Sequence, residues 1–293
     1  MIHIRLIAPS SLPPLQDVEL TKRYLESQGL SVTAPDNMLG EDLLCAHQDD
    51  VRLSHLQDAL IDPSIDMIWL LRGGYGLGRI VPHLHSLEKP EKQKLFIGFS
   101  DGSILHMFLN QVWDWPSLHA PGASQLPDKD VGEASIQETL DIVKNGIASC
   151  RLRPLQAMNA TAQKMTKLEG KVVGGNLCLA TCSLGTDLQI NPKDKILFLE
   201  DIDERGYRID RFLTHLQQAR TFNEVKAIVF GDFIEGYEKD GISLIDPVLE
   251  RFAQTTPVPV FRLPGYGHGK ENFPLPFNTN LTFDVSHQEN LLP

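Results

Sequence analysis

The chain has 293 residues, of which 42% are hydrophobic and 22% are charged, as is typical of a folded protein with one large or two ordinary domains. Its formal net charge of -11 provides no basic surface for a polyanion, so we expect no nucleic-acid partner. The apolar runs fall short of the about 20 residues of a membrane helix, and the first run carries Arg5. We therefore expect no membrane span, no signal peptide and a cytoplasmic location.

Strand-like and helix-like segments alternate in the N-terminal part, which is typical of a parallel sheet covered by helices. The expected elements, in chain order, are a strand over residues 2–8, a helix over 14–29, strands over 30–34, 65–71 and 94–98, and a helix over 104–112. The pattern predicts an α/β fold.

The pattern weakens over residues 127–163, where one helix-like segment stands at 134–145. We interpret this stretch as a linker between an N-terminal domain of residues 1–126 and a C-terminal domain of residues 164–293. The second domain is rich in expected strands, at 195–200, 225–230, 258–262 and 281–285, with an amphipathic helix at 208–220.

One serine lies where a strand meets a helix. Gly98-Phe99-Ser100-Asp101-Gly102 fits G-x-S-x-G, the pattern of a nucleophile elbow, in which a sharp turn projects the serine oxygen outward. The backbone amide of Asp101, at a helix N-terminus, would then point at a developing oxyanion. A serine that only caps the helix is the alternative.

A glycine-rich loop, residues 72–79, follows the strand at 65–71. It fits a dinucleotide fingerprint poorly, because the spacing to a third glycine is wrong and no acidic residue follows at the usual distance. A second glycine-rich stretch, residues 170–176, lacks the ending of a phosphate loop, so ATP is not supported either. Alternatively, Gly73 and Gly74 let the backbone approach a substrate, with Arg72 near its acyl group or carboxylate. A plain tight turn remains open.

A serine nucleophile needs a base and a carboxylate. Glu200 ends the apolar strand at 195–200, and His268 lies in the glycine-rich loop Gly265-Tyr266-Gly267-His268-Gly269. His119 is the second candidate base. A zinc site of His119, His268 and Glu200 lacks a close metal-ligand pair, so we expect neither a metal nor another cofactor.

Five segments together resemble the LD-carboxypeptidase family of serine peptidases. They are Leu71-Arg72-Gly73-Gly74-Tyr75-Gly76, Ile97-Gly98-Phe99-Ser100-Asp101, Leu118-His119-Ala120-Pro121, Leu197-Phe198-Leu199-Glu200-Asp201 with Tyr207-Arg208-Ile209-Asp210-Arg211, and Gly265-Tyr266-Gly267-His268. The resemblance runs in order across nearly the whole chain. It departs from the family at Ala120, where a glycine is usual, and at Gly102, where a β-branched residue is common.

The resemblance implies a triad of Ser100, Glu200 and His268, with an oxyanion hole from the backbone of Gly74 and Asp101. It also implies an N-terminal domain of flavodoxin or glutamine-amidotransferase type, a C-terminal swivelling β/α domain, a homodimer, and a site between the domains.

Family members release the terminal D-alanine of muropeptides in the bacterial cytoplasm by cutting an L,D bond, and this is the expected reaction, with substrate contacts at Arg72, Gly73 and Tyr75. Three alternatives remain. They are an immunity-type peptidase that cuts a peptidyl-nucleotide antibiotic, an α/β-hydrolase-like esterase, and a non-catalytic binding module.

Overall fold

The computed structural model describes residues 1–127 and 130–286, and its chain divides into two compact units. The first unit holds Met1–Cys150 and Phe273–Pro276, and the second holds Arg151–Asn272 and the residues from Phe277 on. The expected linker at 127–163 is thus divided after Cys150. Its residues 128–129, and residues 287–293 of the expected C-terminal domain, lie outside the described part. In the described part, no helix is long and apolar enough to cross a membrane.

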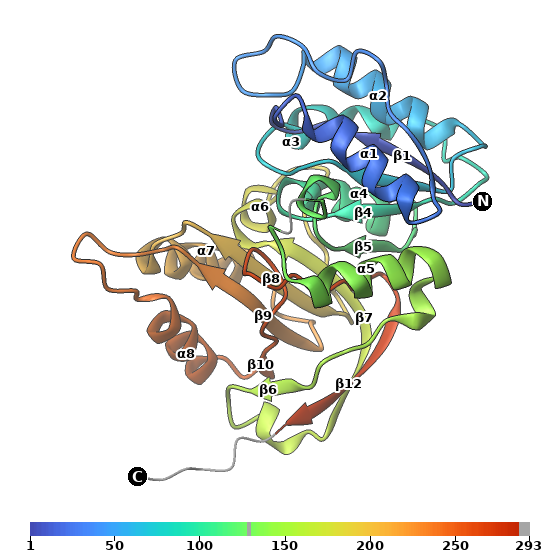
Figure 1. Ribbon diagram of the computed structural model, residues 1–293. Helices are drawn as coiled ribbons and strands as arrows, with labels where there is room; N and C mark the ends of the chain where they lie inside the picture. Colours follow the sequence, from blue (N-terminus) through green and yellow to red (C-terminus); the bar gives the residue numbers. More distant parts are fainter. Residues whose placement is uncertain (128–129, 287–293) are drawn as a thin grey trace. The chain divides into compact units, whose positions relative to one another are not determined.

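The first unit is built on a six-stranded sheet with the strand order β11-β5-β4-β3-β1-β2. Figure 1 labels β1, β4 and β5 of this sheet. Its strands are β1 (His3–Ile7), β2 (Ser31–Thr33), β3 (Met67–Leu70), β4 (Leu95–Gly98), β5 (Ser117–His119) and β11 (Leu275–Phe277). Its α-helices are α1 (Asp17–Ser27), α2 (Asp49–Ile61), α3 (Leu77–Ile80), α4 (Ser103–Gln111) and α5 (Glu133–Asn145). Short 3-10 helices add η1 (Val81–Ser86), η2 (Ser100–Gly102), η3 (Ala123–Gln125) and η4 (Ile147–Ser149).

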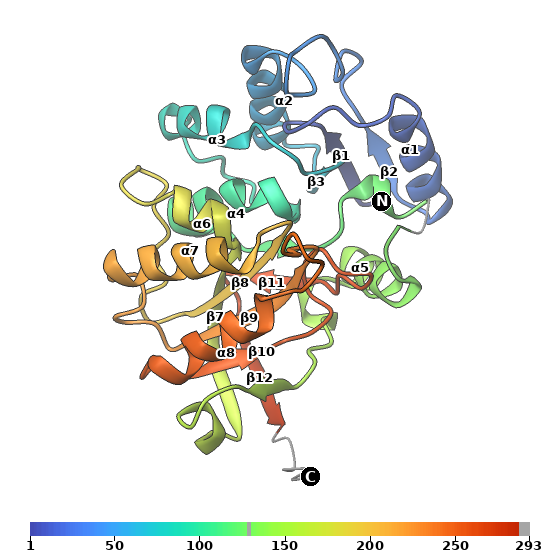
Figure 2. The same cartoon turned by 90° about the vertical axis from the view of Figure 1, so that its left-hand side faces the viewer.

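Strands β1 to β5 pair in parallel, so their carboxyl ends lie along one edge of the sheet. Helices α1 and α5 share a buried core with one sheet face, and Figure 2 shows α2, α3 and α4 on the other side. Chain order reverses between β1 and its neighbour β3. In open α/β sheets, ligands bind beyond the carboxyl ends at such a reversal. The loops after β1 and β3 are therefore favoured positions for a site.

The second unit is a closed barrel with the strand order β10-β6-β12-β7-β8-β9. Its strands are β6 (Leu155–Ala157), β7 (Lys167–Asn176), β8 (Ile196–Ile202), β9 (Ala227–Ile234), β10 (Val260–Arg262) and β12 (Asn280–Ser286). Its helices are η5 (Ala162–Lys164), α6 (Leu177–Cys182), α7 (Gly206–Gln218) and α8 (Ile245–Thr255).

The barrel is mixed. Strands β7, β8, β9 and β10 run parallel to one another, whereas β6 pairs antiparallel with β10 and β12 pairs antiparallel with β7. The α/β class is therefore confirmed, with a parallel sheet in the N-terminal domain and a six-stranded mixed barrel in the C-terminal domain.

Candidate active site

Ser100 stands in a strained turn between β4 and α4. Its φ is +57°, which a residue with a side chain rarely adopts, and Phe99 before it is extended. The chain then enters η2 and α4 directly. This strand, sharp turn and helix are the context that a nucleophile elbow requires. In the same turn, the Asp101 side chain is buried, with 3% of its surface exposed.

Gly73 brings the glycine-rich loop against Ser100. A methyl group placed on Gly73 would lie 2.8 Å from Cβ and 3.0 Å from Oγ of Ser100, and 3.6 Å from the Asp101 amide nitrogen. Any larger residue would therefore crowd the hydroxyl group. Gly74 follows with φ +114°, a conformation that glycine adopts readily. The side chains of Arg72 and Tyr75 are exposed on either side of this pair.

In the second unit, Glu200 and His268 form a buried hydrogen-bonded pair. Oε2 of Glu200 lies 2.5 Å from Nδ1 of His268, and the two side chains are 0% and 10% exposed. Since a carboxylate only accepts, Nδ1 carries the proton, and Nε2 is left as the basic nitrogen. Burial alone lowers the pKa of His268, but the attraction and hydrogen bond of Glu200 outweigh burial and raise it.

The loop that carries His268 is held by two residues that the sequence interpretation missed. The Gly265 amide donates to both carboxylate oxygens of Asp232, at 3.2 and 3.1 Å, and the Gly267 amide donates to Oδ1 of Asn272 at 3.1 Å. Gly267 has φ +126°, and a methyl group on it would lie 2.9 Å from Oε2 of Glu200. The loop therefore reaches its carboxylate only because this residue is glycine.

The side chain of Asp201, next to Glu200, makes a separate set of hydrogen bonds that does not include His268. It accepts hydrogen bonds from Nδ2 of Asn176 at 2.7 Å and from the Cys178 amide at 2.9 Å, which ties β8 to the start of α6. Burial, and repulsion from the neighbouring Glu200, raise the pKa of Asp201 to about 7. Its orientation is that of a structural carboxylate.

His119, the second candidate base, is fully buried in the first unit at the end of β5. Its ring centroid lies 6.1 Å from that of Phe99 and 6.3 Å from that of His106. This is the surrounding of a core histidine. In the described ranges, no group of three or more His, Cys, Asp or Glu residues could hold a metal ion.

The structure thus divides the expected site residues into two sets. Ser100, Asp101 and the residues of the glycine-rich loop are collected in the first unit, and Glu200 is paired with His268 in the second. The fold and the two sets define a two-domain α/β protein with the side chains that serine hydrolases use.

Comparison with known proteins identifies the family. Residues 4–120 match the LD-carboxypeptidase N-terminal domain, and residues 169–283 match the LD-carboxypeptidase C-terminal domain. A Rickettsia conorii protein named "Putative carboxypeptidase" is 37% identical over 95% of this chain and 87% of its own length. The chain belongs to the LD-carboxypeptidase family.

More distant relatives have more specific names. The murein tetrapeptide carboxypeptidase of Pseudomonas aeruginosa is 29% identical over 94% of this chain and 91% of its own. The crystal structure of muramoyltetrapeptide carboxypeptidase from Oxalobacter formigenes has a TM-score of 0.78 at 26% identity, over 96% and 95% of the two chains. An MccF-like protein from Bacillus anthracis has a TM-score of 0.79 at 20% identity, over 97% and 94%, which shows a shared fold.

Proposed function

We propose that this protein is a serine LD-carboxypeptidase that releases the terminal D-alanine from muropeptide tetrapeptides in peptidoglycan recycling. The observation that carries the proposal is the buried hydrogen bond between Glu200 and Nδ1 of His268. It holds the ring proton on Nδ1, which makes Nε2 the basic nitrogen, in a chain whose other unit presents Ser100 on a strained turn. The named relatives that act on murein tetrapeptides support the substrate class.

The proposed reaction is acyl transfer through a Ser100, His268 and Glu200 triad. Nε2 of His268 takes the hydroxyl proton as Oγ of Ser100 attacks the carbonyl carbon of the penultimate residue. The backbone amides of Gly74 and Asp101 stabilise the oxyanion. The imidazolium then protonates the leaving amine, the C–N bond breaks, and water hydrolyses the acyl-enzyme. The proposal requires that the two units bring Ser100 and His268 to within about 3 Å of each other.

Substrate contacts are proposed for Arg72, Gly73 and Tyr75. The Arg72 guanidinium is exposed and donates to the Leu12 carbonyl at 3.3 Å, so charged donors remain for the free carboxylate of the substrate. Gly73 lets the acyl group approach Ser100, and the half-exposed Tyr75 ring offers a flat apolar surface.

The wider setting is part of the same proposal. The order β2-β1-β3-β4-β5 supports an N-terminal domain of flavodoxin type. We further propose a swivelling C-terminal domain, a site between the domains, a homodimer, and a cytoplasmic location. The partners are then the muropeptide and a second copy of the chain, with no nucleic acid or membrane.

The test is an incubation of the purified protein with a muramyl tetrapeptide, followed by mass for the loss of D-alanine. Ser100→Ala and His268→Ala should lower turnover at least 10³-fold, because members of a triad act as a unit. Ser54→Ala, at an exposed position on α2, removes a hydroxyl group without touching the site and should cleave at the wild-type rate. Wild-type turnover by Ser100→Ala would refute the assignment.

The immunity-type alternative uses the same triad on another substrate. Its support is structural likeness alone, such as a TM-score of 0.80 at 18% identity to MccF in complex with glutamyl sulfamoyl guanosine. Parallel assays with a muramyl tetrapeptide and a peptidyl-nucleotide separate the two. Hydrolysis of p-nitrophenyl esters without peptide cleavage would favour the esterase instead.

A further inference from the structure

The Asp101 carboxylate is the centre of a buried group of hydrogen bonds beside the proposed oxyanion hole. Oδ2 accepts from the Ser10 hydroxyl at 2.6 Å and from the Leu77 amide at 2.9 Å. Ser10 is fully buried. This carboxylate is separate from the Asp101 amide that the proposed mechanism uses.

These contacts connect three loops at the carboxyl edge of the sheet. Ser10 follows β1, the glycine-rich loop follows β3, and Asp101 follows β4, and these strands are adjacent in the order β4-β3-β1. Ser11 adds a second contact, because its hydroxyl oxygen accepts from the Tyr75 amide at 3.0 Å. The Tyr75 amide is therefore held by the segment after β1, and the Leu77 amide is held by Asp101.

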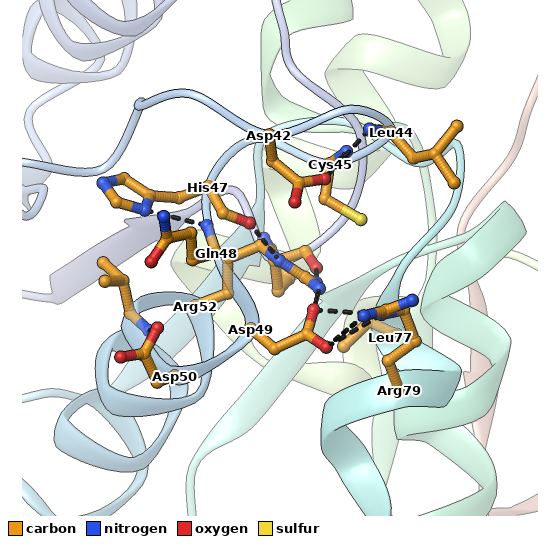
Figure 3. A network of polar contacts seen from close by, with 12 residues as sticks. Asp42, Leu44, Cys45, His47, Gln48, Asp49, Asp50, Arg52, Leu77 and Arg79 are labelled. Carbon is orange, nitrogen blue, oxygen red and sulfur yellow. Dashed lines mark hydrogen bonds and ion pairs between the residues drawn. The ribbon is translucent and has the colours of Figure 1, made fainter.

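A buried arginine forms a second polar network with Asp49, which also contacts Arg79 (Figure 3). The Arg52 side chain is 1% exposed, donates to the Pro9 and His47 carbonyls, and pairs with Asp49. Asp49 also accepts from Arg79 at 2.8 and 3.0 Å. Because Pro9 precedes Ser10, and Arg79 lies on α3 two residues after Leu77, this network restrains the chain at both partners of Asp101.

We propose that the Asp101 carboxylate is a positioning residue, which sets the spacing between the two oxyanion-hole amides through its bonds to Ser10 and Leu77. The inference rests on the proposed function. Asp101 supplies the first amide, and its carboxylate binds the loop that supplies the second, the amide of Gly74. Loss of the carboxylate's hydrogen bonds therefore displaces one amide relative to the other. Displacements of about 1 Å can cost 10²-fold in rate.

A purely structural role makes a different prediction. A buried carboxylate that only stabilises the fold, when replaced, lowers the melting temperature and leaves the catalytic constants of the folded fraction unchanged. A positioning role acts on kcat, since the oxyanion forms only in the transition state, and leaves KM nearly unchanged.

The experiment compares Asp101→Asn and Ser10→Ala with the control Thr139→Val. In Asp101→Asn, a neutral amide oxygen replaces the charged oxygen that accepts from Ser10 and from the Leu77 amide, so both hydrogen bonds are weakened. Ser10→Ala removes one hydroxyl donor and keeps the carboxylate. Thr139 also has a buried hydroxyl, which donates to the Ser135 carbonyl on α5. Thr139→Val therefore removes one buried hydrogen bond, as Ser10→Ala does, but changes no contact of Asp101.

Two ligands provide the decisive readout. A tripeptide with a boronic acid in place of its C-terminal carboxyl forms a tetrahedral adduct with Ser100 and places an oxygen in the hole, whereas the tripeptide product does not form this adduct. We expect Asp101→Asn to lower kcat and to weaken boronate binding by about tenfold to 10²-fold, with KM and the tripeptide Kd within threefold of wild type. Ser10→Ala should show about a threefold to tenfold loss of the same kind, and Thr139→Val none.

The proposal is overturned if Asp101→Asn and Ser10→Ala keep kcat within threefold, or if they weaken both ligands equally. If Asp101→Asn does not fold, Ser10→Ala alone decides. A wild-type protein that releases no D-alanine refutes the proposed function instead. In that case, the rate at which a fluorophosphonate modifies Ser100 measures the same hole, and an unchanged rate in both variants refutes the positioning role.

Discussion

Replacing Glu200 with glutamine removes the charge from the buried pair and keeps the size of the side chain. The carboxylate lies 2.5 Å from Nδ1 of His268 and is fully buried. At an effective dielectric constant of about 20, unit charges at this separation attract each other by about 7 kcal/mol. The imidazolium that forms as Ser100 attacks would lose this attraction. We expect kcat to fall about 10³-fold to 10⁴-fold, which corresponds to about 4–5.5 kcal/mol and lies within the gross attraction.

The same substitution should move the pH profile. The base must be neutral, so kcat/KM rises with pH through the pKa of His268, which Glu200 raises above its ordinary value near 6.5. In Glu200→Gln, burial remains and the attraction is lost, so the pKa falls and the acid limb moves to lower pH. The assay is D-alanine release between pH 5 and pH 9.

Glu250→Gln on the exposed face of α8 is the matched control for the loss of one negative charge, and it should leave both kcat and the profile unchanged. A Glu200→Gln variant with kcat within tenfold of wild type, or with an unshifted acid limb, would refute the assigned role of this pair.

Two further predictions concern Gly73 and Asp201. Gly73→Ala, whose methyl group would lie 2.8 Å from Cβ of Ser100, should lower kcat/KM at least 10²-fold, whereas Gly78→Ala, with no atom within 4 Å, should not; equal activities would contradict the close approach. Since the pKa of Asp201 is raised to about 7 from 3.8, its charged form is disfavoured in the folded state, and the protein should lose stability as pH rises from about 4 to 7. Between pH 5 and pH 8, urea unfolding should show a loss about 2 kcal/mol larger for wild type than for Asp201→Asn, and equal losses would contradict the assigned burial.

The sequence predicts the elements that are bounded apolar runs. Strands β1, β3 and β4 were expected to within two residues, because each is a short apolar stretch between turn residues. Helix α2 was not expected, since its buried face includes the charged Arg52 beside Leu56 and Leu60, which blurs the apolar period.

Strand β7 was missed for a different reason. It contains Gly174 and Gly175, and two consecutive glycines ordinarily indicate a loop. In the barrel, a side chain on Gly174 would collide with the Phe198 carbonyl on β8, so glycine is required by the close approach of two strands. Such a requirement is set by a distant segment, and the local sequence does not contain it.

The proposed triad residues were found by local context, and their supports were not. Ser100 and His268 each lie in a glycine-flanked turn after a strand, which is a signal within a few residues. Ser10, Asp232 and Asn272 act through hydrogen bonds to chain segments between 5 and 91 positions away. Ser10 could have been noticed as a polar residue just past β1, but its partner follows only from the strand order.

In the proposed reaction, each unit supplies one partner of the same proton transfer. In the first, Ser100 lies on a strained turn, the absence of a side chain on Gly73 leaves room beside its hydroxyl group, and the Asp101 carboxylate accepts from the Leu77 amide. In the second, a buried charge on Glu200 raises the pKa of His268. A serine hydroxyl group needs a base to become a nucleophile, and a basic imidazole needs a proton donor within reach to act as that base. The proposed reaction therefore requires both units of the chain.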